Sequence, residues 1–141
     1  PEETYYGNKI RKLIEELGLE KEVLILESVA YEDIPSYYHY AKINIYASSC
    51  ESYGIILLEK LAAGKPVFCS NFEPFPEIAG NSVEYFDPYQ PNTLTTLFLK
   101  YLDDESAMRQ LGEKASHHAE KFDWADTASQ TWKALELQMN P

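Results

Sequence analysis

The sequence predicts an α/β fold, a doubly wound parallel sheet with helices on both faces, ending in an all-helical C-terminal segment. Short apolar runs alternate with helical patterns up to residue 86, and such alternation is typical of a parallel sheet. From residue 92 onward the pattern is helical only. The 141 residues, 45% hydrophobic and 25% charged, suffice for one domain with a substantial core.

The strands are expected where apolar runs of four or five residues stand between turn residues. They are residues 22–26, 42–46, 67–70 and 83–86. The run EVLIL at 22–26 is typical of a strand buried on both faces.

The helices are expected where apolar residues recur at helical spacing or between capping residues. They are residues 8–17, 33–40, 54–64, a short turn at 74–80, and 92–102, 106–121 and 124–139. Asn8 is the expected cap of the first helix and Gly18 its stop. Asp33 is the expected cap of the second, with Pro35 in its first turn, where the missing N–H does no harm.

One carboxylate interrupts the most apolar of these helices. The side chains from Gly54 to Gly64 are apolar nearly all the way round, as in a helix packed on two sides. Lys60 can extend its ammonium to water, but Glu59 is short, and a buried carboxylate needs a partner. The plain alternative is that the face carrying Glu59 is solvated.

A second carboxylate, Glu51, stands just ahead of this helix. Free backbone N–H groups and the helix dipole make an anion site there, and Gly54 lets a ligand approach the backbone closely. Glu59 lies about 7 to 8 Å farther along the axis. Carboxylates accept hydrogen bonds from hydroxyls, and N–H groups donate to phosphate, so this arrangement suits a sugar nucleotide. Alone, Glu51 is better explained as a surface acid favoured by the dipole, but together with Glu59 and the Gly54 turn the ligand-binding interpretation is preferred.

The motif ESYGIILLEKLAAGKPV, followed by Pro-Glu-Ile and Phe-Asp-Pro, resembles the signature of the retaining glycosyltransferases of family 4, also called group 1. These enzymes have the two-domain GT-B architecture, and the resemblance covers residues 8–135. It implies a Rossmann-like C-terminal half of GT-B. The form of PEIAGNSVEYFDP resembles members that build bacterial cell-surface polysaccharides with mannose-like donors.

The resemblance also implies roles for particular residues. Glu51, the expected catalytic residue, would hold hydroxyls of the donor sugar, and Glu59 the ribose. The remaining donor-binding positions are the backbone of Tyr53, Gly54 and Ile55 for sugar and phosphates, Ser28 and Val29 at the nucleobase, and Asn71 and Glu77 beside the donor. For Glu77, a simple first-turn acid is an equally good interpretation.

By this resemblance, residues 1–141 form a single partial domain. The first strand and its basic loop, and the N-terminal acceptor domain, are expected to be absent. The function expected is metal-independent, retaining hexosyl transfer from a nucleotide diphosphate sugar, without a cofactor, to a saccharide or lipid-linked acceptor. The fragment alone would be inactive. The alternatives are a non-catalytic nucleotide-binding or interaction module and, more remotely, a doubly wound domain of the phosphate-dependent sugar isomerase kind.

Composition excludes several partners. The net charge of −11 argues against nucleic acid and anionic membrane for these residues. Neither a leader nor an apolar run near twenty residues is found, so we expect a cytoplasmic protein without a transmembrane segment. Peripheral association of a full-length enzyme with the membrane is compatible with this.

The cysteines and histidines give no metal site. Cys50 and Cys69 lack ligand spacing and are expected as packed thiols rather than a disulfide. His117 and His118 are adjacent and so point in different directions on a helix.

Overall fold

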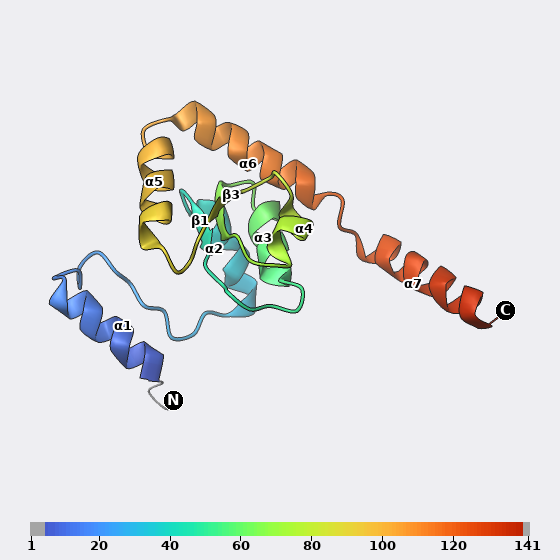
Figure 1. The fold of residues 1–141 in the computed structure, drawn as a ribbon, viewed down its shortest axis with the longest axis horizontal. Coiled ribbons are helices and arrows are strands. Elements are labelled where there is room, and N and C mark those ends of the chain that lie inside the picture. Colours follow the sequence, from blue (N-terminus) through green and yellow to red (C-terminus); the bar gives the residue numbers. More distant parts are fainter. Residues whose placement is uncertain (1–4, 140–141) are drawn as a thin grey trace. The chain divides into compact units, whose positions relative to one another are not determined.

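The computed structural model describes residues 5–139, which divide into two compact units with the boundary after Tyr31 (Figure 1). Each unit is described by itself. In the N-terminal unit, α1 (Tyr5–Glu16) ends at Gly18, as expected. Gly18 has a φ of +65°, its N–H donates to the carbonyl of Glu15, and the N–H of Leu19 donates to that of Ile14. These two bonds satisfy carbonyls that the helix leaves open at its end.

Two expectations for this unit are wrong. The first helix begins at Tyr5, so Asn8 lies inside it and does not cap it. No proline precedes Asn8 in the described part, and each added turn gains backbone hydrogen bonds. Residues 22–26 form no strand, and Leu24 is 80% exposed. Apolar residues favour burial, but a strand also needs a neighbouring strand for its backbone hydrogen bonds. The strand pairs found among the described residues do not include residues 22–26.

The second unit is built on a three-stranded parallel sheet in the order β1-β2-β3. The strands are β1 (Asn44–Tyr46), β2 (Val67–Ser70) and β3 (Glu84–Phe86). Tyr46 pairs with Cys69, and Ser70 with Phe86, so the carboxyl ends of the strands meet at one edge. The expected strands at 42–46, 67–70 and 83–86 are confirmed, with ends shifted by two residues at most.

The helices of this unit also follow the expected order. They are α2 (Ile34–Tyr40) after a 3-10 turn (Tyr31–Asp33), α3 (Ile55–Ala62), α4 (Phe75–Ala79), α5 (Pro91–Tyr101), α6 (Glu105–Ala119) and α7 (Trp124–Met139). Asp33 holds the N-cap position of α2 but makes no side-chain capping bond. Its helical backbone, φ −88° and ψ −20°, differs from the extended one in which a side chain reaches the first free N–H groups.

Helices cover both faces of the sheet, as the sequence predicts (Figure 1). Along β2, Val67 and Cys69 pack into a core with residues of α3, α4 and α6. Phe68 points to the opposite face, into a second core with residues of α5 and α6. This continuous burial of β2 is the reason its sequence is apolar without alternation.

Candidate functional site

Glu51 lies in the loop that leaves the carboxyl end of β1. Its Oε1 accepts a hydrogen bond of 2.7 Å from the hydroxyl of Tyr46 and one of 3.2 Å from the hydroxyl of Ser48. Tyr46 is the last residue of β1 and is 8% exposed, whereas Glu51 is exposed. A carboxylate open to solvent is therefore held through one oxygen by the buried last residue of β1.

The loop is also held by the neighbouring strand. The hydroxyl of Ser70, at the end of β2 and fully buried, donates a hydrogen bond to the carbonyl of Ser48. Because β1 and β2 are paired up to Tyr46 and Cys69, this bond continues the connection between the strands into the loop. Glu51 thus stands at the edge where parallel sheets bind ligands.

Gly54 is the turn between Glu51 and α3. It is buried, has a φ of +90°, and occupies the N-cap position of α3. A Cβ there would lie 2.9 Å from Cε1 of Phe75, too close for an unshifted contact. Only glycine combines this backbone with this approach. Tyr53 and Ile55, on either side, are 46% and 51% exposed, so the turn is open to solvent.

The expectation that α3 is packed on two sides is wrong for the described residues. Leu57 and Leu61 are fully buried, but Ile55 and Ile56 are 51% and 46% exposed. Helical periodicity places Glu59 opposite the buried pair, and it is half-buried rather than enclosed. Apolar residues on a helix favour burial, but the described residues of this unit bury only the side of α3 that carries Leu57 and Leu61.

The charge of Glu59 nevertheless acts on α2. Burial first, and then the negative charge of Glu59, raise the pKa of Tyr38. The ammonium of Lys60 lies 4.2 Å from the centre of the Tyr38 ring, and burial lowers the pKa of Lys60. The role of Glu59 toward a ribose remains a prediction.

The other expected donor-binding positions, beyond the turn at Gly54, are distributed over both units. Asn71 is exposed after β2, and its N–H donates to the carbonyl of Phe86. Glu77 is exposed in the first turn of α4. Ser28 and Val29 belong to the N-terminal unit. The loops after β1 and β2 thus bring Glu51 and Asn71 to one sheet edge, and the nucleobase positions stay a prediction.

Sequence reasoning missed three residues that build this site. The sequence places Tyr46 in an expected strand and Phe75 in an expected short helix, and it signals no role at the site for either of them or for Ser48. The Tyr46 ring packs edge-on against Phe75, with centroids 5.1 Å apart. A spacing of five residues between Tyr46 and Glu51 matches neither strand nor helix periodicity, so no local pattern signals their hydrogen bond.

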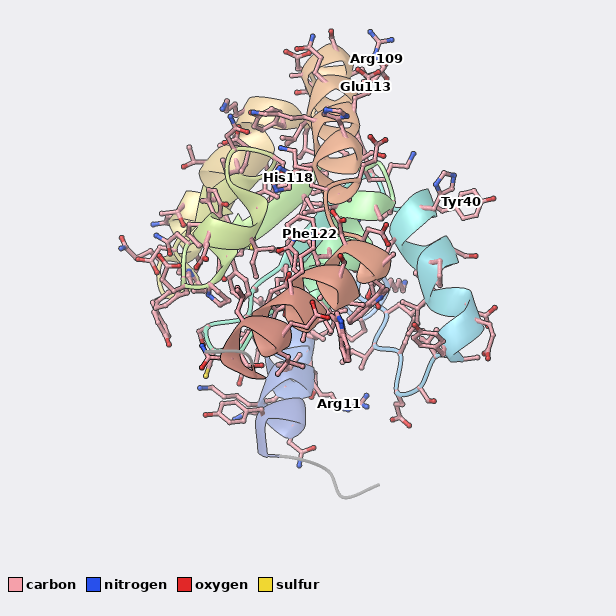
Figure 2. All side chains as sticks on the ribbon, turned by 90° about the vertical axis from the view of Figure 1, so that its right-hand side faces the viewer. Arg11, Tyr40, Arg109, Glu113, His118 and Phe122 are labelled. Carbon is pink, nitrogen blue, oxygen red and sulfur yellow. The ribbon has the colours of Figure 1, made fainter. Side chains whose placement is uncertain are left out.

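The two cysteines differ in burial, and His118 has a packing role. Cys50 is exposed and Cys69 buried, and both are free, so the expectation of packed thiols is correct for Cys69 alone. Cys50 lies in the open loop, where no core is available. His118 bonds the carbonyl of Ile78 at 2.7 Å and packs against Phe122 (Figure 2). Within residues 5–139 no cluster of three potential metal ligands is found.

The fold, together with the sheet edge at which Glu51 and Asn71 lie, defines a class of protein. It is a doubly wound α/β domain of the kind found in GT-B glycosyltransferases. Sucrose-phosphate synthase from Thermosynechococcus elongatus superimposes with a TM-score of 0.86 at 21% identity, covering 99% of this chain and 36% of that one. HepE from Anabaena, solved with UDP and glucose, gives 0.86 at 23% identity, covering 95% and 37%. The chain belongs to the glycosyl transferases group 1, whose family model matches residues 5–118.

Curated relatives agree with this family. O-antigen chain mannosyltransferase B from Escherichia coli is 30% identical over 126 residues, 89% of this chain and 33% of its own length. D-inositol 3-phosphate glycosyltransferase from Corynebacterium glutamicum is 31% identical over 122 residues, 85% of this chain and 29% of its own. The chain spans about a third of the length of these relatives.

The helices within residues 5–139 have at most 16 residues. None of them combines the length and the apolar character that crossing a membrane requires.

Proposed function

We propose that this chain is the donor-binding part of a retaining glycosyltransferase that transfers a hexosyl unit from a nucleotide diphosphate sugar. One observation carries the proposal: Glu51 is held at the end of β1, directly ahead of the left-handed Gly54 that opens α3. Membership of the glycosyl transferases group 1 gives this arrangement its chemical meaning. Two relatives named as glycosyltransferases support it.

The chemistry follows from the groups at the turn. The first N–H groups of α3 and the helix dipole favour negative charge, so they would accept the diphosphate of the donor. The left-handed backbone of Gly54, packed against Phe75 where a Cβ would not fit, sets the start of α3 and so the direction of these N–H groups. Glu51 would accept hydrogen bonds from hydroxyls of the transferred sugar. Charge that develops on the leaving diphosphate would be met by the same N–H groups, which are positioned before reaction.

Glu59 would bind the ribose of the donor. It is half-buried beside the exposed Ile55 and Ile56, so a nucleoside lying along this side of α3 would cover apolar surface and present hydroxyls to the acid. The same contact would explain why an otherwise apolar helix keeps one carboxylate.

The acceptor is proposed to bind outside these residues, to a second α/β domain of the full-length enzyme. A saccharide or lipid-linked acceptor in cell-surface polysaccharide or glycoconjugate synthesis would fit the relatives that act in O-antigen and inositol glycoside formation by name. We further propose that the transfer needs no divalent ion. Turnover of the full-length enzyme should then persist in excess EDTA.

The roles of the two acids can be tested in the full-length enzyme. Glu51→Gln and Glu59→Gln should each lower kcat/KM by about 10- to 100-fold, since each removes a charged hydrogen bond to the donor. Glu113→Gln is the matched control, because Glu113 lies exposed on α6, with its Oε1 3.8 Å from Nε of Arg109 (Figure 2). Unchanged kinetics in both site variants would refute the assignment. Donor binding without any turnover in the unaltered protein would favour a non-catalytic module.

A further inference from the structure

We propose that Tyr46 is a positioning residue for Glu51: with Ser48 it holds Oε1 and leaves Oε2 for a hydroxyl of the donor sugar. This inference rests on the proposed function, because it assigns a role to the residue that holds the acid. The hydroxyl of Tyr46 lies 2.7 Å from Oε1, a short distance for a hydrogen bond to a charged acceptor. Within the described residues, neither of the two bonds to this carboxylate uses Oε2.

The Tyr46 hydroxyl is a fixed point in the structure. Its backbone belongs to β1 and pairs with Cys69 of β2. Its ring is 8% exposed and packs edge-on against Phe75, at an interplanar angle of 68°. A rigid phenol has only two side-chain torsions, and packing holds both. The acid that it bonds is exposed and lies on a loop rather than in the sheet.

Ser48 supplies a second donor to the same oxygen. Its hydroxyl carries one proton, and Oε1 of Glu51 at 3.2 Å is nearer than its other acceptor, the carbonyl of Cys50 at 3.4 Å. The backbone of Ser48 is in turn held by the hydroxyl of Ser70. Two donors from separate positions restrict rotation of the carboxylate about its last torsion. The oxygen left over therefore has a defined direction before any ligand binds.

The phenol remains a donor over the ordinary pH range. Burial, followed by the hydrogen bond to Glu51, raises the pKa of Tyr46 well above its usual value. Tyr46 therefore keeps its proton wherever the enzyme would work, and the bond does not depend on pH there.

A purely structural role for this hydroxyl is a poor explanation. The ring alone fills the space beside Phe75, so phenylalanine would pack equally well. The acceptor is an exposed carboxylate, and hydrogen bonds to exposed charges add little to the stability of a fold. What the bond does supply is orientation of one acid, which is useful only if that acid binds something.

The test compares two ligands in the full-length protein: a nucleoside diphosphate and the same nucleotide carrying its sugar. Calorimetric titrations with UDP and UDP-glucose, and with GDP and GDP-mannose, identify the pair that binds. Tyr46→Phe should weaken binding of the sugar nucleotide about tenfold and leave the diphosphate unchanged, because only the sugar contacts Glu51. Tyr101→Phe is the control: its ring belongs to the second core and its hydroxyl bonds Glu84, so both affinities should stay as they are.

A second measurement separates positioning from packing. If Tyr46 acts through Glu51, then Tyr46→Phe should have no further effect on sugar-nucleotide binding in a Glu51→Gln background. An additive effect, an equal loss for both ligands, or unchanged affinity for both would overturn the inference and leave the proposed function standing. Failure of the unaltered protein to bind any of the four ligands would overturn the proposed function, and the inference with it.

Discussion

Gly112 of α6 lies directly against the backbone of Gly64, two residues beyond the end of α3. A Cβ built on Gly112 would stand 2.5 Å from the carbonyl oxygen of Gly64 and 3.3 Å from Cα of Lys65. The same helix contributes to both cores, with Ala115 in one and Met108 and Leu111 in the other. The contact therefore joins α6 closely to the chain just beyond α3, the helix that Gly54 opens.

Gly112→Ala should lower the free energy of unfolding by about 1–3 kcal/mol, as overpacking of a close-packed contact does. The atoms it meets are backbone and cannot rotate away. The loss should occur even though alanine favours a helix over glycine by about 1 kcal/mol. Urea unfolding would measure it, with Glu113→Ala on the exposed side of the same helix as the control. If Gly112→Ala were as stable as the unaltered protein or more so, α6 would be able to move away from the backbone of Gly64 and Lys65 without a loss of stability.

Gly54→Ala should destabilise the protein more than Gly64→Ala, although both residues have a positive φ. Their φ values are +90° and +69°, so both substitutions carry backbone strain of about 1 kcal/mol or more. At Gly54 the new Cβ would also meet Phe75 at 2.9 Å, whereas at Gly64 the nearest atom is 3.9 Å away. The difference between the melting temperatures of the two variants measures the destabilisation caused by the steric contact with Phe75. Equal melting temperatures would mean that Phe75 moves aside without loss.

The sequence predicted the elements of the sheet well, because its apolar runs are long enough to define β1, β2 and β3. It placed Glu51 and Gly54 correctly at the turn before α3, since a glycine after polar residues indicates the start of that helix. It failed at residues 22–26, where burial was inferred from composition although strand pairing depends on partners distant in the chain. The hydrogen bond from Tyr46 to Glu51 was missed for a related reason. Hydrophobic periodicity indicates that a ring is packed, but it does not indicate which group the hydroxyl of that ring bonds.

The two thiols should differ sharply in reactivity. Cys50 is exposed, whereas Cys69 is buried, and burial raises the pKa of the Cys69 thiol to about 12. Only the thiolate reacts, so at pH 8 one thiol should be modified rapidly by a chromogenic disulfide reagent in the native protein. The second should react only after unfolding in urea. In Cys50→Ser the rapid phase should disappear, and rapid reaction of two thiols in the unaltered protein would contradict the burial of Cys69.

The same buried thiol should make the protein less stable at alkaline pH. The ordinary pKa of a cysteine is 9.0, and in the fold that of Cys69 is raised to about 12 by burial. Between these values the unfolded chain has lost the thiol proton and the folded chain keeps it, so the free energy of unfolding falls as pH rises.

The contribution of the protonated Cys69 thiol to stability is fully present below pH 9.0. It is lost as the pH rises through the folded pKa, and the free energy of unfolding falls by up to about 1.4 kcal/mol per pH unit. Urea unfolding at about pH 7.5 and about pH 10.5, below and above the ordinary thiol pKa of 9.0, should show a smaller pH-dependent loss in Cys69→Ala than in the unaltered protein. An identical loss in both would mean that other buried groups, such as Tyr85, whose pKa burial also raises to about 12, account for the alkaline effect.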